Sequence, residues 1–194
     1  QYKSLFQPKG VKGLGDDDDP QHGFSPKNNF YYCPGEQLSP YFDIFGGEEE
    51  PYVEIPAKAT GNDHFDSRPG RNDWYETVKL NYGVDYYAGG IGLFEPIPDT
   101  WQKMLDIMLF WASKGVDAFR CDMAEMVPSA FWSWALSRLK SDYPEITIIG
   151  EVYNPSLYRS YIASGFDLLY DKVGMYDTLR AVVCGYASAS SITG

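Results

Sequence analysis

GVDAFRCD, residues 115–122, and ITIIGE, residues 146–151, are short apolar stretches that each end in a carboxylate. Each stretch predicts a β-strand, and the residues between them have the length and apolar spacing of one helix. In a βαβ unit the two strands run parallel, so Asp122 and Glu151 should emerge at the same edge of the sheet. Because neighbouring strands lie about 4.8 Å apart, we expect the two carboxylates to approach to ~5–5.5 Å, a separation at which two acids can act on one bond.

Residues 97–194 alternate between helix and strand patterns around these stretches. The first predicted helix follows Pro98 and has one apolar face, formed by Trp101, Met104, Leu105, Met108, Leu109 and Ala112. Further helices are predicted after Pro128, after Pro155 and over residues 175–183, with a third strand over residues 166–170. Strands that are apolar nearly throughout predict a parallel sheet buried on both faces. A doubly wound sheet and a (β/α)8 barrel both fit, and the lack of a GxGxxG or P-loop sequence weakens the nucleotide-binding doubly wound fold.

Residues 1–96 are rich in Gly, Pro, Asp, Asn and Tyr, and their periodicity is weak. We expect a small, irregular, β-rich subdomain here, with short strands at residues 52–55 and 76–80. The run Asp16-Asp17-Asp18-Asp19 fits a solvated turn, and a calcium site is the sharper alternative because hard cations prefer oxygen ligands.

The composition of the 194 residues excludes several classes of protein. Aromatic residues make up 16% of the chain, too many for a disordered protein. The net charge of −11 argues against nucleic acid and anionic lipid as partners, while a neutral sugar is compatible with it. No stretch of about 20 apolar residues predicts a membrane span. The three cysteines show no metal-binding spacing.

The segment Phe119-Arg120-Cys121-Asp122, preceded by Gly115-Val116-Asp117, resembles the nucleophile segment of the α-amylase family of glycoside hydrolases. The segment Ile149-Gly150-Glu151-Val152-Tyr153 resembles the acid/base segment of that family, and residues 78–82 match a short family motif more weakly. The resemblance implies that the three predicted strands are about the fourth to sixth strands of a (β/α)8 TIM barrel with flanking helices. Residues 1–96 would then be the subdomain inserted between the third strand and the third helix.

The same resemblance implies that the chain is an internal piece of a larger catalytic domain. The family's D-x-x-x-N-H and N-H-D motifs, the latter holding its third carboxylate, do not occur in this sequence, whose histidines are His22 and His64. The rest of the barrel would lie outside the chain. We therefore expect the isolated 194 residues to be inactive.

The resemblance assigns a retaining double-displacement mechanism to these residues. Asp122 would be the nucleophile, and Arg120, two residues earlier on the same strand, would keep it ionised. Glu151 would first protonate the leaving oxygen and then act as a base, so we expect its pKa to be raised. The reaction would hydrolyse α-glucans such as starch, or α-glucosides, in carbohydrate metabolism.

Four further residues are candidates for contacting the oligo- or polysaccharide substrate. Glu125 and Met126 follow the nucleophile where many relatives carry Lys-His, and a plain loop role fits them equally well. Trp74 and Tyr82 could stack on a sugar ring or fill the core of the first half. Calcium is a possible structural ion that the chemistry does not require. The family resemblance also suggests an extracellular or cell-envelope location.

Three alternatives stay open at this point. A transglycosylase of the same family differs only in its acceptor, a sugar in place of water. Asp122, Glu151 and Asp171 end three successive strands, as metal ligands do in some barrels, although Arg120 would compete with a divalent cation for the carboxylates. A non-catalytic barrel fragment is the third alternative, because unpaired sheet edges favour association with a partner.

Overall fold

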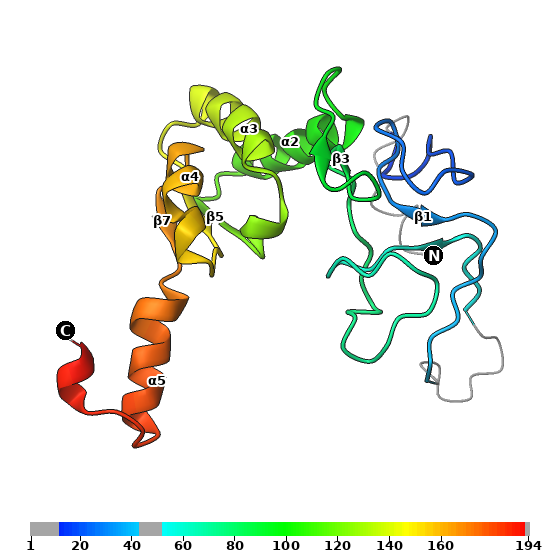
Figure 1. Ribbon diagram of the computed structural model, residues 1–194. Helices are drawn as coiled ribbons and strands as arrows, with labels where there is room; N and C mark the ends of the chain where they lie inside the picture. The colour runs from blue at the N-terminus through cyan, green and yellow to red at the C-terminus, as the bar shows by residue number, and fades with distance from the viewer. Residues whose placement is uncertain (1–11, 43–51, 193–194) are drawn as a thin grey trace. The chain divides into compact units, whose positions relative to one another are not determined.

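The computed structural model describes residues 12–42 and 52–192, and the chain forms two compact units, Gln1–Lys103 and Met104–Gly194 (Figure 1). The boundary between the units lies inside helix α2 (Asp99–Ala112). Assignment of residues 1–96 as an inserted subdomain stays a prediction. Among the described residues, no helix combines the length and the apolar character that crossing a membrane requires.

The first unit contains two short antiparallel ladders joined by long loops. Strand β1 (Tyr32–Cys33) pairs with β2 (Ala57–Lys58), and β3 (Val84–Asp85) pairs with β4 (Ile91–Gly92). The strand predicted at residues 52–55 is wrong, because Tyr52, Val53 and Ile55 are all more than half exposed and bury no face. From residues 76–80, only Leu80 takes part in pairing, through an isolated bridge to Phe30.

An aromatic cluster replaces the aliphatic core that the first unit lacks. Tyr31 is 1% exposed, and its ring lies 5.3 Å from that of Phe65 and 5.6 Å from that of Tyr86, both edge-on. The fully buried Asn81 donates its amide to the carbonyl of Ser25 and accepts from the N–H of Gly83. Side-chain hydrogen bonds of this kind hold loops that have no ladder of their own.

Two helices of the expected length follow. Helix α2 buries Trp101, Leu105, Met108 and Ala112 of the predicted apolar face, and Gly115 then ends the helical region with a φ of 80°. Helix α3 (Ser129–Asp142) begins directly after Pro128. It buries the apolar set Phe131, Trp132, Ala135, Leu136 and Leu139.

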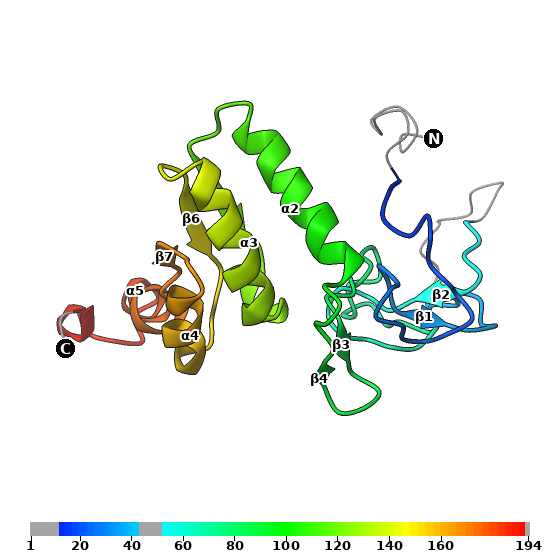
Figure 2. The same cartoon turned by 90° about the horizontal axis from the view of Figure 1, so that it is seen from above.

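A three-stranded parallel sheet forms the centre of the second unit, in the order β5-β6-β7. The strands are β5 (Ala118–Cys121), β6 (Thr147–Gly150) and β7 (Leu168–Leu169), and Figure 2 shows β6 beside β7. Ala118 pairs with Thr147 and Cys121 with Gly150, so β5 and β6 run in step to the same edge. The mixed α/β class with a parallel sheet is confirmed, and each strand is shorter than its apolar stretch.

The sheet is not buried on both faces, which corrects the expectation from its apolar composition. Strand β5 alternates between exposed and half-buried residues, while β6 alternates between half-buried and buried ones, with Ile148 fully buried. One face therefore meets the core formed by α3 and Phe166, whose ring lies 5.0 Å from that of Trp132. The other face of β5 is accessible among the described residues.

Shorter elements complete the second unit. The 3₁₀ turn η1 (Ala124–Met126) lies between β5 and α3, and η2 (Pro155–Leu157) leads into α4 (Tyr158–Ala163) after β6. After β7 come the π-helical turn η3 (Lys172–Tyr176), α5 (Asp177–Val183) and η4 (Ala189–Ile192).

Candidate active site

The ends of β5 and β6 bring the two predicted acids together. Cys121 and Gly150 are paired across the ladder, and the N–H of Glu151 donates to the carbonyl of Cys121 over 3.0 Å. Asp122 and Glu151 therefore each stand one residue beyond a paired position. Each of the two carboxyl groups shifts the pKa of the other, so the two groups interact directly.

Arg120 bridges the two carboxylates. Its Nη1 lies 2.8 Å from Asp122 Oδ1, and its Nη2 lies 2.8 Å from Glu151 Oε2. The alternation of a strand places the side chains of Arg120 and Asp122 on one face, as predicted. A guanidinium is suited to this position because its planar fork can serve two carboxylates at once.

Tyr170, just after β7, supports the guanidinium and is a residue that the motifs did not indicate. Its hydroxyl accepts a hydrogen bond from Arg120 Nε over 3.3 Å, and its ring centroid lies 5.6 Å from the guanidinium carbon. The available signal was its place at the end of the third strand, since parallel strands gather their end residues at one edge. Three successive strand ends thus contribute to one cluster.

Glu151 is the enclosed member of the pair and Asp122 is the open one. The side chain of Glu151 is 7% exposed, against 74% for Asp122. Glu151 Oε2 accepts the N–H of Met123 over 2.9 Å, and Glu151 Oε1 accepts the hydroxyl of Tyr153. Met123 has a φ of 43°, a left-handed conformation rare for this residue type, and it aims that N–H at the carboxylate.

These contacts shift the two pKa values in the directions opposite to those expected. The hydrogen bond between the two carboxyls raises the pKa of Asp122 and lowers the pKa of Glu151 to about 2. The hydroxyl of Tyr153, the N–H of Met123 and the charge of Arg120 further stabilise ionised Glu151, and they outweigh its burial. The pKa of Glu151 is therefore lowered, which corrects the raised pKa expected for the acid/base.

Glu125 has a structural role in the site. Its Oε2 accepts the N–H groups of Tyr153 and Asn154, each over 3.0 Å, and so ties η1 to the loop after β6. Met126 lies next to it in the same turn and is half-buried, with its N–H donated to the carbonyl of Met123. Contact of either side chain with substrate stays a prediction.

Tyr82 and Trp74 belong to the first unit. Tyr82 is 7% exposed, and its carbonyl accepts the indole N–H of Trp101, so its ring could stack on a sugar only after leaving the core. Trp74 is 38% exposed and has a φ of 43°. Its carbonyl accepts both the N–H and the hydroxyl of Thr77, and its role as a sugar platform stays a prediction.

The carboxylates considered for metal binding have other partners. Asp171 accepts the N–H of Gly174 over 2.7 Å and caps the π-helical turn. Asp18 of the four-Asp run accepts the N–H groups of Asn29 and Phe30 and the hydroxyl of Tyr32. Within residues 12–42 and 52–192, no group of three or more His, Cys, Asp or Glu side chains is arranged to hold a metal ion. Calcium stays a prediction without a ligand set.

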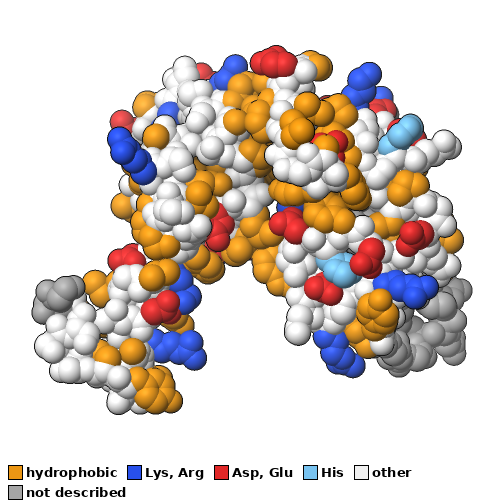
Figure 3. Space-filling view, in the orientation of Figure 1, with side chains coloured by type: hydrophobic (Ala, Val, Ile, Leu, Met, Phe, Trp, Pro, Cys, Tyr) orange, Lys and Arg blue, Asp and Glu red, His pale blue; other side chains and the backbone are white. Residues whose placement is uncertain are grey.

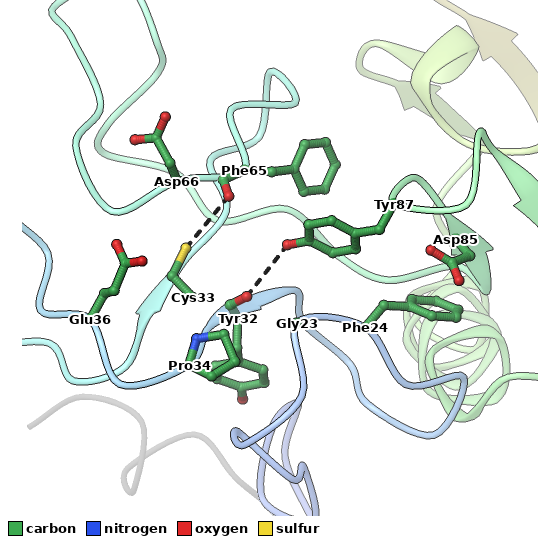
Figure 4. A pocket seen from close by; sticks show the side chains of 10 residues that line it. All are labelled: Gly23, Phe24, Tyr32, Cys33, Pro34, Glu36, Phe65, Asp66, Asp85 and Tyr87. Atoms are coloured by element: carbon green, nitrogen blue, oxygen red, sulfur yellow. Dashed lines mark hydrogen bonds between the residues drawn. The ribbon is translucent and has the colours of Figure 1, made fainter.

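A cleft of about 510 Å³ lies in the first unit and is drawn in Figure 4. Its lining combines aromatic rings and carboxylates: Phe24, Tyr32, Phe65 and Tyr87 with Glu36, Asp66 and Asp85. The carboxylates accept hydrogen bonds from their own chain, as Asp66 does from the N–H of Arg68 and Glu36 from the hydroxyl of Ser67. These contacts give the acidic groups a structural role in holding the loops of this unit.

Comparison with known proteins gives partial matches. No protein-family model matches the chain. It is 31% identical over 94 residues to the alpha-1,4-glucan:maltose-1-phosphate maltosyltransferase of Cereibacter sphaeroides, which is 46% of this chain and 15% of that protein. The enzyme of the same name from Methylacidiphilum infernorum is 34% identical over 71 residues, 36% of this chain and 11% of that protein.

Among solved structures, an α-amylase from Lactobacillus plantarum aligns with a TM-score of 0.45 and 25% identity. The alignment covers 63% of this chain and 28% of that chain. This chain thus spans less than a third of the length of each of these proteins.

Proposed function

From the confirmed resemblance of this chain to the α-amylase family, we propose that it carries the catalytic pair of a retaining enzyme acting on α-glucans or α-glucosides. Asp122 is the nucleophile, Glu151 is the acid/base, and Arg120 positions both. We further propose that β5, β6 and β7 are the fourth to sixth strands of a (β/α)8 barrel, with residues 1–96 as the insertion before its third helix.

One observation carries the proposal: two carboxylates at the ends of adjacent parallel strands are bridged by one guanidinium, at 2.8 Å to each. A pair that shares a proton can divide acid and nucleophile between its members. Asp122 is open to solvent, as a group that attacks a substrate must be, and Arg120 favours its charged form.

The reaction requires an ionised Asp122 and a protonated Glu151, which is the opposite of the directions in which their two pKa values are shifted. A sugar entering between the carboxyls breaks their direct hydrogen bond, which removes the main cause of the raised Asp122 pKa. Asp122 then bonds to the anomeric carbon as the bond from that carbon to the leaving oxygen breaks, and Glu151 gives its proton to that oxygen. In the second step Glu151 takes a proton from the acceptor, whose oxygen displaces Asp122 with overall retention.

The acceptor decides between two candidate activities. Water gives a glycoside hydrolase, which the motifs alone suggest. A sugar hydroxyl gives a transglycosylase, and the maltosyltransferase relatives specifically favour this second candidate. The two differ in one assay: hydrolysis releases reducing ends from maltotetraose alone, whereas transfer from maltose 1-phosphate releases phosphate and lengthens the acceptor by one maltosyl unit.

The site is tested in a protein that supplies the remaining barrel strands together with these residues. We expect Asp122→Asn and Glu151→Gln each to lower kcat/KM at least ~10²-fold, and a slow fluoroglucosyl substrate to leave a mass adduct on Asp122. Inversion of the anomeric configuration, or an adduct on another residue, would refute the mechanism.

For residues 1–194 alone we propose no hydrolase activity. The described part of the parallel sheet has three strands, and the sequence holds no N-H-D motif for a third carboxylate. Cleavage of maltooligosaccharides by the isolated chain would contradict this proposal.

An extracellular or cell-envelope location and a structural calcium ion are further proposals. The calcium ion is tested by comparing the melting temperature of the chain in the presence of calcium and in the presence of a chelator.

A further inference from the structure

Tyr153 makes a contact with the acid/base candidate that the mechanism above leaves unused. It follows Glu151 by two residues, and its hydroxyl turns back to Glu151 Oε1. Resting on the proposed function, we propose that Tyr153 is a positioning residue whose hydroxyl occupies the place of the leaving-group oxygen on Glu151 and holds Glu151 ionised until substrate displaces it.

The two oxygens of Glu151 have different kinds of partner, and this difference identifies the reacting one. Besides its interaction with Asp122, Glu151 has two partners on Oε2 that can only donate, Arg120 Nη2 and the N–H of Met123. A proton on Oε2 would collide with them. Oε1 faces the hydroxyl of Tyr153, which can donate to a carboxylate or accept from a carboxylic acid. Oε1 is therefore the oxygen that can carry the catalytic proton.

The backbone of Tyr153 is held while its hydroxyl can turn. Its N–H donates to Glu125 Oε2 over 3.0 Å, so the start of the loop after β6 is fixed to η1. The phenol itself is half-buried, unlike the enclosed carboxylate that it contacts. A change in its side-chain torsions, with no movement of the strand, would vacate Oε1 for a glycosidic oxygen.

The charged and titratable groups near Glu151 come from three neighbouring parts of the unit. Arg120 lies on β5 and Asp122 directly follows it, Glu125 lies on η1, and Tyr170 follows β7. The interaction with Asp122 favours ionised Glu151 most strongly, and the N–H of Met123 and the charge of Arg120 favour it as well, with or without Tyr153. The hydroxyl of Tyr153 adds to them, because donation to the charged form lowers the pKa of the acceptor. The same bond raises the pKa of Tyr153 to about 12.

The test is a carboxyl ¹³C NMR titration of the 194-residue chain labelled at glutamate, with Glu151 assigned by its loss in Glu151→Gln. We expect Tyr153→Phe to raise the Glu151 midpoint by about one pH unit, a tenfold change in its proton affinity. Tyr158→Phe is the matched control, since it removes a nearby hydroxyl that donates to the carbonyl of Tyr170. It should leave the midpoint unchanged.

A second readout covers the case in which Tyr153→Phe does not fold. In Glu151→Gln the phenol of Tyr153 should titrate closer to the ordinary value near 10, because its charged partner is gone. A Glu151 midpoint that is ordinary in the unmodified chain, or that is the same in the unmodified chain and in Tyr153→Phe, would overturn the proposal.

These titrations need no turnover, so they separate the inference from the function on which it rests. If the proposed function were wrong, no glycoside chemistry would be found, while Tyr153→Phe would still raise the Glu151 midpoint. In an active protein, Tyr153→Phe should shift the alkaline limb of kcat/KM upward, because the acid stays protonated to higher pH. A purely structural role of Tyr153 would lower activity without moving that limb.

Discussion

At the scale of single residues, the side chain of Glu125 ties η1 to the loop after β6. The two hydrogen bonds of its side chain go to the backbone of the loop that carries Tyr153. Glu125→Ala leaves two N–H donors without this acceptor, and we expect a loss of about 1–3 kcal/mol in the free energy of unfolding. Glu125→Gln keeps an acceptor oxygen and should lose less than half of that, as measured by urea denaturation.

Glu145→Ala is the control for this pair, since it removes an exposed glutamate just before β6. If Glu125→Ala proved as stable as the control while impairing substrate binding, the side chain would contact sugar and the structural role would be refuted.

Gly150 is the residue at which the sheet leaves no room beside the acid. A Cβ there would lie 2.7 Å from Phe166 Cδ1 and 2.8 Å from Leu169 Cδ2. Gly150→Ala should therefore destabilise the chain by about 1–3 kcal/mol through overpacking. Thermal unfolding would show a lower Tm than for Ser133→Ala, a change at an exposed position of α3. An unchanged Tm would mean that the ring of Phe166 can move aside freely.

The sequence predicts the two acids of the candidate site but not the directions of their pKa shifts. The positions of Asp122 and Glu151 at one sheet edge were predictable, because each residue ends an apolar stretch and the two strands pair in register. The place of Arg120 beside Asp122 was predictable from the alternation of side chains along a strand. The low pKa of Glu151 depends first on its interaction with Asp122. It depends further on the hydroxyl of Tyr153 and the N–H of Met123, whose directions arise from a loop and from a left-handed backbone. The spacing of residues in the sequence does not encode such local geometry, so the expectation of a raised pKa for Glu151 was wrong.

At the scale of elements, Asp167 joins a helix to two strands. It stands one residue before β7, accepts the N–H of Ile148 in β6 over 2.8 Å, and pairs with Lys140 of α3 at 2.5 Å. Burial opposes its ionisation, but these two partners outweigh that effect, and the pKa of Asp167 is lowered. The connection of α3 to the sheet therefore depends on a charged group just before the start of β7.

We expect Asp167→Asn to lower the free energy of unfolding by about 1 kcal/mol at pH 7. A carboxyl whose pKa is lower in the folded state stabilises above its unfolded pKa, near 3.8 here, and loses that contribution as pH falls further. The difference between the variant and the parent chain should thus shrink below about pH 4 in urea titrations. Asp142→Asn, at an exposed position of α3, is the control; a difference independent of pH would contradict the role of the charge.

The order of elements in the second unit was predictable because each helix has a clear apolar face and each strand an apolar run. The burial of the strands was not predictable, because an apolar composition does not show whether helices cover both faces of the sheet. The strand expected at residues 52–55 failed for a related reason: β-forming residues need a partner and a buried face, and Tyr52, Val53 and Ile55 have no buried face.

At the scale of the whole molecule, the second unit exposes much apolar surface. Val183 is 85% exposed on α5, and Tyr186 just beyond it is 87% exposed. Figure 3 shows hydrophobic side chains at the surface in this part of the chain. Leu168 of β7 is also more than half exposed. Exposed apolar surface and open strand edges favour association.

We therefore expect the 194-residue chain to self-associate reversibly at micromolar concentration, seen as a rising mean mass in sedimentation velocity. Val183→Glu should weaken that association, because a charge placed on the apolar surface must lose water when two copies meet. Ser133→Glu adds the same charge at an exposed position of α3 and should leave association unchanged, which separates local burial from a general effect of net charge. Equal weakening by both variants would show that charge repulsion alone governs the contact, while a monomer at all concentrations would mean that these apolar groups do not form a contact between copies.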